Sequence, residues 1–252
     1  DPLGYTTIYG KLFKISQKFH VSRDSSERKY LSSVDAIVTS TKFYAESLKK
    51  KYPILQNRVY YNYFGYIDKT IYVSEKKPSN VITIAYGGAM GHLQSPEILA
   101  YASRGFSNVK VIFIGNVSYF KKFDFSGINV EFYDSMNREA FLQFLSQNVD
   151  IGFLSLSGEI SNYCIPSKLY DYINIGLPVL ASISGDSADI INRNDYGLAC
   201  PYDESKLREC IRKYSQEKNI ITKYKANVLR DKDKWYMGNL ISELCFIIDD
   251  LK

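Results

Sequence analysis

Short apolar runs alternate with amphipathic segments over most of the chain, and this alternation predicts strands separated by helices. Each run is continuously apolar, which is typical of strands in a parallel sheet that helices cover on both faces. The expected strands are residues 81–86, 109–115, 130–133, 150–154 and 178–182. The expected helices span 138–146, 168–175 and 187–192, and another begins at Ser95-Pro96-Glu97 with a serine cap and a proline at its first position. The pattern predicts an α/β protein with a Rossmann-like, doubly wound parallel sheet.

The earlier part of the chain predicts a smaller βαβ unit. Residues 34–40 and 58–64 are apolar runs, and residues 41–52 between them form a helical segment that ends before Pro53. Farther upstream, residues 8–19 predict a helix with lysines on one face and apolar side chains on the other. This helix either lies on a membrane surface or packs on its own domain, and the second interpretation is the commoner case.

A change in composition divides the chain. The stretch from 65 to 80 turns polar and rich in lysine, which is typical of a linker. We therefore expect four parts, which are a partial N-terminal domain at 1–66, a linker at 67–80, the Rossmann-like domain at 81–230, and a closing segment at 231–252 whose amphipathic helix starts at Trp235. The chain begins at Asp1, so we expect it to be a fragment that lacks its first part.

Composition narrows the class of protein. The 252 residues are 45% hydrophobic and 23% charged, as in a folded domain, and the net charge of +5 is too small to favour a nucleic-acid partner. The four cysteines have no metal-ligand spacing and suggest neither a zinc site nor a disulfide framework, which fits a reducing cytoplasm. The longest uncharged apolar stretch, 173–185, is shorter than the roughly 20 residues that a membrane span needs.

The first candidate for chemistry is the glycine-rich turn after the strand at 81–86. In an open parallel sheet, ligands bind beyond the carboxyl ends of the strands, so the loops that follow strands are the places to search. Gly87 and Gly88 open such a loop and let a diphosphate approach the backbone amides closely. The alternative is a tight strand-to-helix turn that needs a positive φ, and the loop lacks the full spacing of a dinucleotide fingerprint.

The second candidate is the loop at 158–172, which opens a helix at Pro166 or Ser167. Lys168 then falls in the first helical turn, where the helix dipole disfavours a cation, and an anionic ligand would compensate. Asp171, one turn later, could accept hydrogen bonds from a ribose or sugar hydroxyl. The alternative is that both side chains are ordinary solvated surface charges.

These residues carry a resemblance to a known family. Residues 165–182, IPSKLYDYINIGLPVLAS, resemble the PSK and G-x-PV segment of GT-B glycosyltransferases, in particular those of glycosyltransferase family 4. Residues 34–52 resemble the end of that family's N-terminal domain, and 185–198 its late donor loop and N-x-G-L turn. The resemblance implies a C-terminal domain that binds a nucleotide sugar, preceded by the last βαβ unit of an acceptor domain.

The resemblance also implies roles for individual residues. Lys168 and Asp171 are expected to be catalytic, Lys168 as a phosphate contact and Asp171 as the second acid of the family's E-x7-E pair. The first acid falls at Tyr163, while Glu159 lies four residues earlier in the same loop. The family's basic residue beside the glycine loop is absent. The residues expected to bind the donor are Gly87, Gly88, Gly115, Glu159, Tyr163, Ser167, Lys168, Asp171, Gly185 and Asp186.

The implied activity is the transfer of a hexose from a nucleotide-diphosphate sugar to a glycan or lipid-linked acceptor, with retention, in cell-surface polysaccharide synthesis. No metal or other cofactor is expected, and Asp231-Lys232-Asp233, which imitates a metal-binding DxD, is expected to be solvated. The expected location is the cytoplasm, with peripheral contact at the inner membrane face. Two alternatives are a GT-B nucleotide-sugar epimerase and a catalytically silent nucleotide-binding module.

Overall fold

The computed structural model describes residues 17–69, 79–217 and 219–249. Its main body is a six-stranded parallel sheet in the order β5-β4-β3-β6-β7-β8. The strands are β3 (Ile82–Gly88), β4 (Val109–Gly115), β5 (Val130–Tyr133), β6 (Ile151–Ser155), β7 (Val179–Ser182) and β8 (Gly197–Cys200). The expected α/β class and doubly wound sheet are confirmed. The strand order reverses at β3, the first strand of the sheet, so a crevice opens at its carboxyl end.

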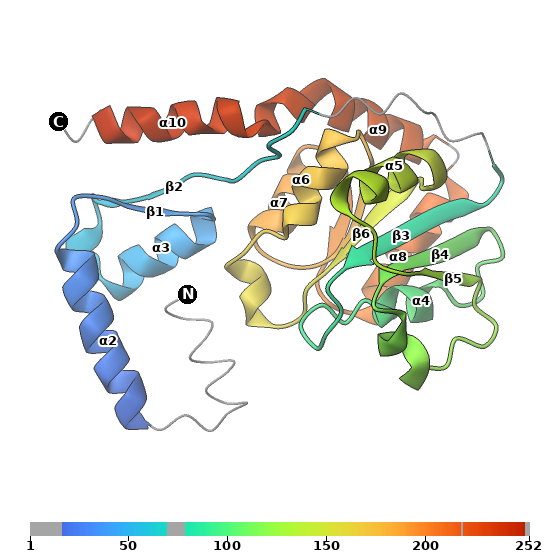
Figure 1. Ribbon diagram of the computed structural model, residues 1–252, viewed down its shortest axis with the longest axis horizontal. Helices are drawn as coiled ribbons and strands as arrows, with labels where there is room; N and C mark the ends of the chain where they lie inside the picture. Colours follow the sequence, from blue (N-terminus) through green and yellow to red (C-terminus); the bar gives the residue numbers. More distant parts are fainter. Residues whose placement is uncertain (1–16, 70–78, 218, 250–252) are drawn as a thin grey trace.

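Helices cover both faces of this sheet, as Figure 1 shows. They are α4 (Glu97–Ser103), α5 (Arg138–Asn148), α6 (Ser167–Asn174), α7 (Asp186–Arg193), α8 (Glu204–Gln216) and α9 (Ile220–Asp231). Side chains of a strand alternate between the two faces. Ile84 of β3 therefore packs in one apolar cluster with Leu99 and Leu207, while its neighbour Ala85 packs in the other with Leu142. Two cores, one on each face, hold the layers together.

The N-terminal part forms the expected βαβ unit. Strands β1 (Ile37–Thr39) and β2 (Val59–Tyr61) pair in parallel, and α3 (Lys42–Lys51) connects them. Thr41 caps α3, since its hydroxyl oxygen accepts the Tyr44 N–H at 3.1 Å. Helix α2 (Gln17–Ser32) precedes this unit and was not predicted. The amphipathic helix expected over 8–19 lies mostly outside the described residues, as does most of the linker expected at 67–80.

The last helix, α10 (Met237–Asp249), returns to the N-terminal part (Figure 1). The Asn62 side-chain amide donates to the Leu240 carbonyl at 3.0 Å, and the Met237 N–H donates to the Tyr66 carbonyl at 2.9 Å. The prediction that this helix starts at Trp235 is wrong, because Trp235 ends the short 3-10 helix η5 (Lys232–Trp235) and is buried in the main core. None of the helices in the described ranges is long and apolar enough to cross a bilayer.

Two further predictions need correction. The helix after β3 begins one residue later than expected, at Glu97, and Ser95 is not its side-chain cap. The Ser95 hydroxyl instead donates back to the His92 carbonyl at 2.8 Å. Strand β8 was missed, because Gly197, Ala199 and Cys200 give it little of the β-branched and aromatic character that marks a strand.

Candidate functional site

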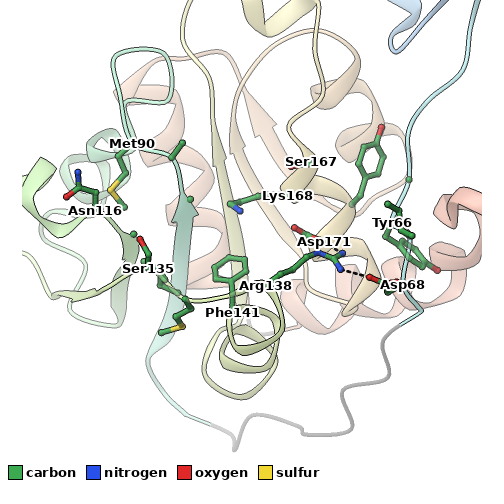
Figure 2. A pocket seen from close by; sticks show the side chains of 18 residues that line it. Tyr66, Asp68, Met90, Asn116, Ser135, Arg138, Phe141, Ser167, Lys168 and Asp171 are labelled. Carbon is green, nitrogen blue, oxygen red and sulfur yellow. Dashed lines mark hydrogen bonds and ion pairs between the residues drawn. The ribbon is translucent and has the colours of Figure 1, made fainter.

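The carboxyl ends of β3 and β4 form a floor of bare backbone. Gly88 and Gly115 are partners in the β3–β4 register, and both have positive φ, +129° and +149°. A Cβ on Gly115 would lie 2.7 Å from the Gly88 carbonyl oxygen, so a side chain there is excluded. A cleft of about 820 Å³ opens beside this floor. It is lined by Gly65, Tyr66, Ile67, Asp68, Gly88, Ala89, Met90, Ile114, Gly115, Asn116, Ser135, Met136, Arg138, Phe141, Ser167, Lys168, Tyr170 and Asp171 (Figure 2).

Lys168 reaches this floor from the first turn of α6. A Cβ on Gly88 would lie 2.4 Å from Lys168 Cε, so the lysine stem lies directly over the bare glycine. The glycine turn and the start of α6, which the sequence offers as two separate candidates, therefore line one cleft. Gly87 does not line the cleft, because a Cβ there would meet the Phe141 ring at 2.2 Å. Its role is to let Phe141 pack against β3.

The surroundings of the Lys168 ammonium favour the binding of an anion. It lies 4.8 Å from the centre of the Phe141 ring, and it makes no hydrogen bond or salt bridge within the described part of the chain. Burial lowers the pKa of Lys168, an effect that Asp171 opposes and Arg138 reinforces. Helix α6 adds its own polarity, since Pro166 at its N-cap offers no side-chain acceptor and the first N–H groups of a helix have no partner within it.

Asp171 lines the same cleft one helical turn after Lys168 and is held by Arg138, which is not among the site residues expected from the sequence. Arg138 Nη2 donates to Asp171 Oδ1 at 2.9 Å, and Arg138 Nη1 donates to Asp68 Oδ2 at 2.9 Å, as Figure 2 shows. A signal for Arg138 existed, because it starts the helix after β5 and the carboxyl ends of parallel strands share one edge. Asn137 caps that helix by accepting the Ala140 N–H at 2.9 Å, which fixes where Arg138 stands.

Besides Gly87, four expected donor-binding residues do not line this cleft, namely Glu159, Tyr163, Gly185 and Asp186. Glu159 is exposed on the 3-10 helix η4 (Glu159–Asn162). The Tyr163 ring packs edge-on against Phe43 and Tyr44 of α3, with ring centres 5.1 and 5.9 Å away. Tyr163 therefore contributes an apolar contact between α3 and the main body, where the family pattern has an acid.

Gly185 and Asp186 join the same junction. Asp186 begins α7 and points at the start of α3, where it accepts the Lys42 N–H at 2.5 Å and the Phe43 N–H at 3.3 Å. The Tyr63 hydroxyl also donates to it at 3.2 Å. A Cβ on Gly185 would lie 2.6 Å from Asn162 Cα, so glycine permits the close approach of η4. Asp186 thus has partners at the start of α3 and on Tyr63, and its expected contact with a donor stays a prediction.

Replacing Asp186 with alanine should lower the free energy of unfolding by about 1–2 kcal/mol, because the N-terminal turn of α3 loses its carboxylate acceptor. Urea unfolding followed by circular dichroism measures this loss, and hydrogen exchange should speed up at the Lys42 and Phe43 amides. Asp189→Ala is the matched control, since Asp189 is exposed on the same helix and pairs only with Arg193 among the described residues. Equal effects of the two substitutions would contradict the assignment.

The Asp231-Lys232-Asp233 segment is only partly solvated, because Asp231 is buried and Asp233 is exposed. Asp231 is only 5% exposed and pairs with Arg230 at 2.7 Å and with Lys234 at 3.0 Å. The hydrogen bond from Arg230 lowers the pKa of Asp231 well below its ordinary value, although burial opposes the shift. Asp233 remains exposed and lies 3.7 Å from Lys69. Within the described ranges, no three His, Cys, Asp or Glu side chains gather in a way that could hold a metal ion.

Comparison with solved structures identifies the fold. The chain superposes on HepE of Anabaena in complex with UDP and glucose (TM-score 0.67, 11% identity, 86% of this chain and 64% of HepE). It also superposes on the lipopolysaccharide outer core galactosyltransferase WaaB, with a TM-score of 0.66 and 15% identity over 86% of this chain and 62% of WaaB. A third match is sucrose-phosphate synthase from Thermosynechococcus elongatus, with a TM-score of 0.69 and 12% identity over 95% of this chain and 64% of the synthase. No protein-family model matches the sequence, and no curated protein is significantly similar to it.

These neighbours are GT-B glycosyltransferases, and the chain shares their fold. It spans less than two thirds of the length of each of the three. At identities of 11–15%, the similarity concerns the fold alone. Membership of glycosyltransferase family 4 stays an expectation from the sequence.

Proposed function

We propose that the protein binds the diphosphate of a nucleotide sugar in the cleft between β3 and α6 and serves in sugar transfer to an acceptor hydroxyl. The observation that carries this proposal is the position of Lys168. Its ammonium, which pairs with no carboxylate among the residues that the structure describes, is held over a bare glycine floor, at the start of a helix and at the switch point of a parallel sheet. All four features favour an anion at the same spot.

In the proposed reaction, the bond between the sugar's anomeric carbon and the diphosphate oxygen breaks while a bond to the acceptor oxygen forms. The electron pair of the broken bond leaves with the diphosphate, which gains a negative charge, and the acceptor hydroxyl releases its proton to water. Lys168 and the N–H groups of α6 stabilise that charge, which is greatest as the bond breaks. Asp171 orients the donor by accepting hydrogen bonds from its hydroxyl groups. This assignment requires no metal ion to neutralise the leaving group.

The finer features of the proposal draw on the neighbours. HepE is described with UDP and glucose, and the pneumococcal O-GlcNAc transferase GtfA with UDP and GlcNAc, which supports a hexosyl donor here. WaaG is described as involved in lipopolysaccharide biosynthesis, which supports a glycan or lipid-linked acceptor. We further propose retention at the anomeric carbon, a role in cell-surface polysaccharide synthesis, and work in the cytoplasm at the inner membrane face.

A panel of nucleotides tests the proposal. Isothermal titration calorimetry with UDP, GDP, ADP and TDP, and with the matching monophosphates, should show binding of at least one diphosphate that is about tenfold tighter than its monophosphate, since a second phosphate adds a charge-assisted contact. Mass spectrometry of products formed from matching sugar donors then separates transfer from epimerisation. Product formed without an acceptor would favour the epimerase. Diphosphate binding without any product would favour the silent nucleotide-binding module. If no diphosphate binds, the proposal is refuted.

A further inference from the structure

The first turns of α5 and α6 face each other across the cleft, and each carries a pair of side chains that reaches the other helix. Arg138 and Phe141 are three residues apart on α5, and Lys168 and Asp171 are three residues apart on α6. Two contacts cross the gap. Arg138 Nη2 pairs with Asp171 Oδ1 at 2.9 Å, and Lys168 Nζ lies 4.8 Å from the Phe141 ring centre (Figure 2).

This crossed pairing is not the one that helix geometry alone favours. Residues three apart on a helix are neighbours on its surface, so the Asp171 carboxylate has Lys168 within reach. The two attract each other, because Asp171 acts to raise the pKa of Lys168. The carboxylate nevertheless pairs with Arg138, and its side chain is only 13% exposed in that pair. Lys168 consequently keeps its ammonium for another anion.

Arg138 is itself held from a second side. Its Nη1 donates to Asp68 Oδ2 at 2.9 Å, and the backbone of Asp68 is fixed because the buried Asn174 side chain donates to its carbonyl at 2.8 Å. The planar guanidinium fork engages both carboxylates at once, an arrangement that a lysine ammonium reproduces poorly. The Asp68–Arg138–Asp171 triad therefore fixes the direction of the Asp171 carboxylate.

We propose that Arg138 is a positioning residue of the anion site, which holds the Asp171 carboxylate and thereby prevents it from neutralising Lys168. The identity of the anion as a donor diphosphate rests on the proposed function, whereas the diversion of Asp171 from Lys168 does not. Arg138 acts through Asp171 and contacts no phosphate. When Arg138 is lost, Asp171 turns to Lys168 and occupies the ammonium that a phosphate needs.

A double-mutant cycle with inorganic pyrophosphate tests this role, because that probe has no ribose or sugar for Asp171 to contact. Arg138→Ala should weaken pyrophosphate binding about tenfold in the wild-type background and less than about threefold in the Asp171→Asn background. Equal losses in both backgrounds would overturn the inference, because they would mean that the guanidinium acts on the phosphate directly. Arg193→Ala, which removes an exposed arginine from α7, is the control for loss of one positive charge.

A second readout needs no ligand. The pKa of Lys168 can be followed by NMR of the side-chain Cε and Nζ nuclei in a labelled protein. Arg138→Ala should raise this pKa by more in the wild-type background than in the Asp171→Asn background, because only the former gives Lys168 a new carboxylate partner. Equal rises would overturn the inference even where the protein binds pyrophosphate. If wild-type protein binds neither pyrophosphate nor a nucleoside diphosphate, the proposed function fails, and the Lys168 titration still decides the role of Arg138.

Discussion

Replacing Lys168 with methionine is expected to weaken the binding of the preferred nucleoside diphosphate about 30-fold, the scale of one charge-assisted hydrogen bond. Methionine keeps an apolar stem over Gly88 and beside Phe141, so the substitution removes the charge with little change in packing. Calorimetry of the wild-type and variant proteins with the same diphosphate measures the difference.

The stability of this variant separates a binding role from a structural one. The Lys168 ammonium is desolvated and pairs with no carboxylate in the described ranges, so its removal should leave the free energy of unfolding unchanged or slightly higher. Lys206→Ala on α8, an exposed lysine outside the cleft, should change neither quantity. Unaltered diphosphate affinity in Lys168→Met would refute the phosphate contact.

The lowered pKa of Lys168 predicts how diphosphate binding depends on pH. Burial lowers the pKa of Lys168, and only the protonated form attracts a diphosphate. Affinity should therefore fall with rising pH, and the fall should begin at a lower pH than for an ordinary lysine. The decline should be absent in Lys168→Met, which calorimetry across the alkaline range can establish.

The sequence predicts those parts of the cleft whose position follows from the order of neighbouring strands and helices along the chain. Gly88 and Lys168 were found because each stands where an apolar strand gives way to a helix, and a parallel sheet brings such places to one edge. Asp171 followed from its spacing on the same helix. The βαβ unit was found for a similar reason, since Thr41 and Pro53 mark both ends of α3.

The contacts between distant elements could not be predicted in this way. Arg138 starts an ordinary capped helix, and only the folded structure reveals that its guanidinium spans Asp68 and Asp171, which are 103 residues apart in sequence (171 − 68). Asp186 follows a glycine in a loop that resembles a donor loop, yet it meets α3 because the N-terminal unit folds onto α7. Charge and spacing along the chain do not say which partner a carboxylate meets.

The contacts of Trp235 in the core could not be predicted from the sequence either. Its apolar neighbours suggested the first turn of the last helix, but its ring lies between two tyrosines, with centres 6.0 Å from both Tyr63 and Tyr170. Its indole N–H donates to the Tyr196 hydroxyl at 3.0 Å. Its carbonyl accepts the Tyr66 N–H at 3.0 Å, which ties the cleft wall to the main core.

Replacing Trp235 with alanine is therefore expected to lower the free energy of unfolding by about 3–5 kcal/mol, the range for a buried aromatic side chain. Tyr170 immediately precedes Asp171 on α6, so the cavity left behind should also loosen the wall that carries the Arg138 pair. Trp235→Phe should lose less, about 1–2 kcal/mol, because it keeps much of the packing and removes the hydrogen bond to Tyr196. Circular dichroism is the probe, since Trp235 is the only tryptophan.

Phe246 provides the control for this prediction, because its ring is 73% exposed on α10. Phe246→Ala should change the free energy of unfolding by less than about 0.5 kcal/mol. A comparable loss in both alanine variants would mean that η5 and α10 unfold as one unit, separate from the main sheet. A loss confined to Trp235→Ala, together with weaker diphosphate binding at temperatures where the variant remains folded, would mean that η5 belongs to the support of α6.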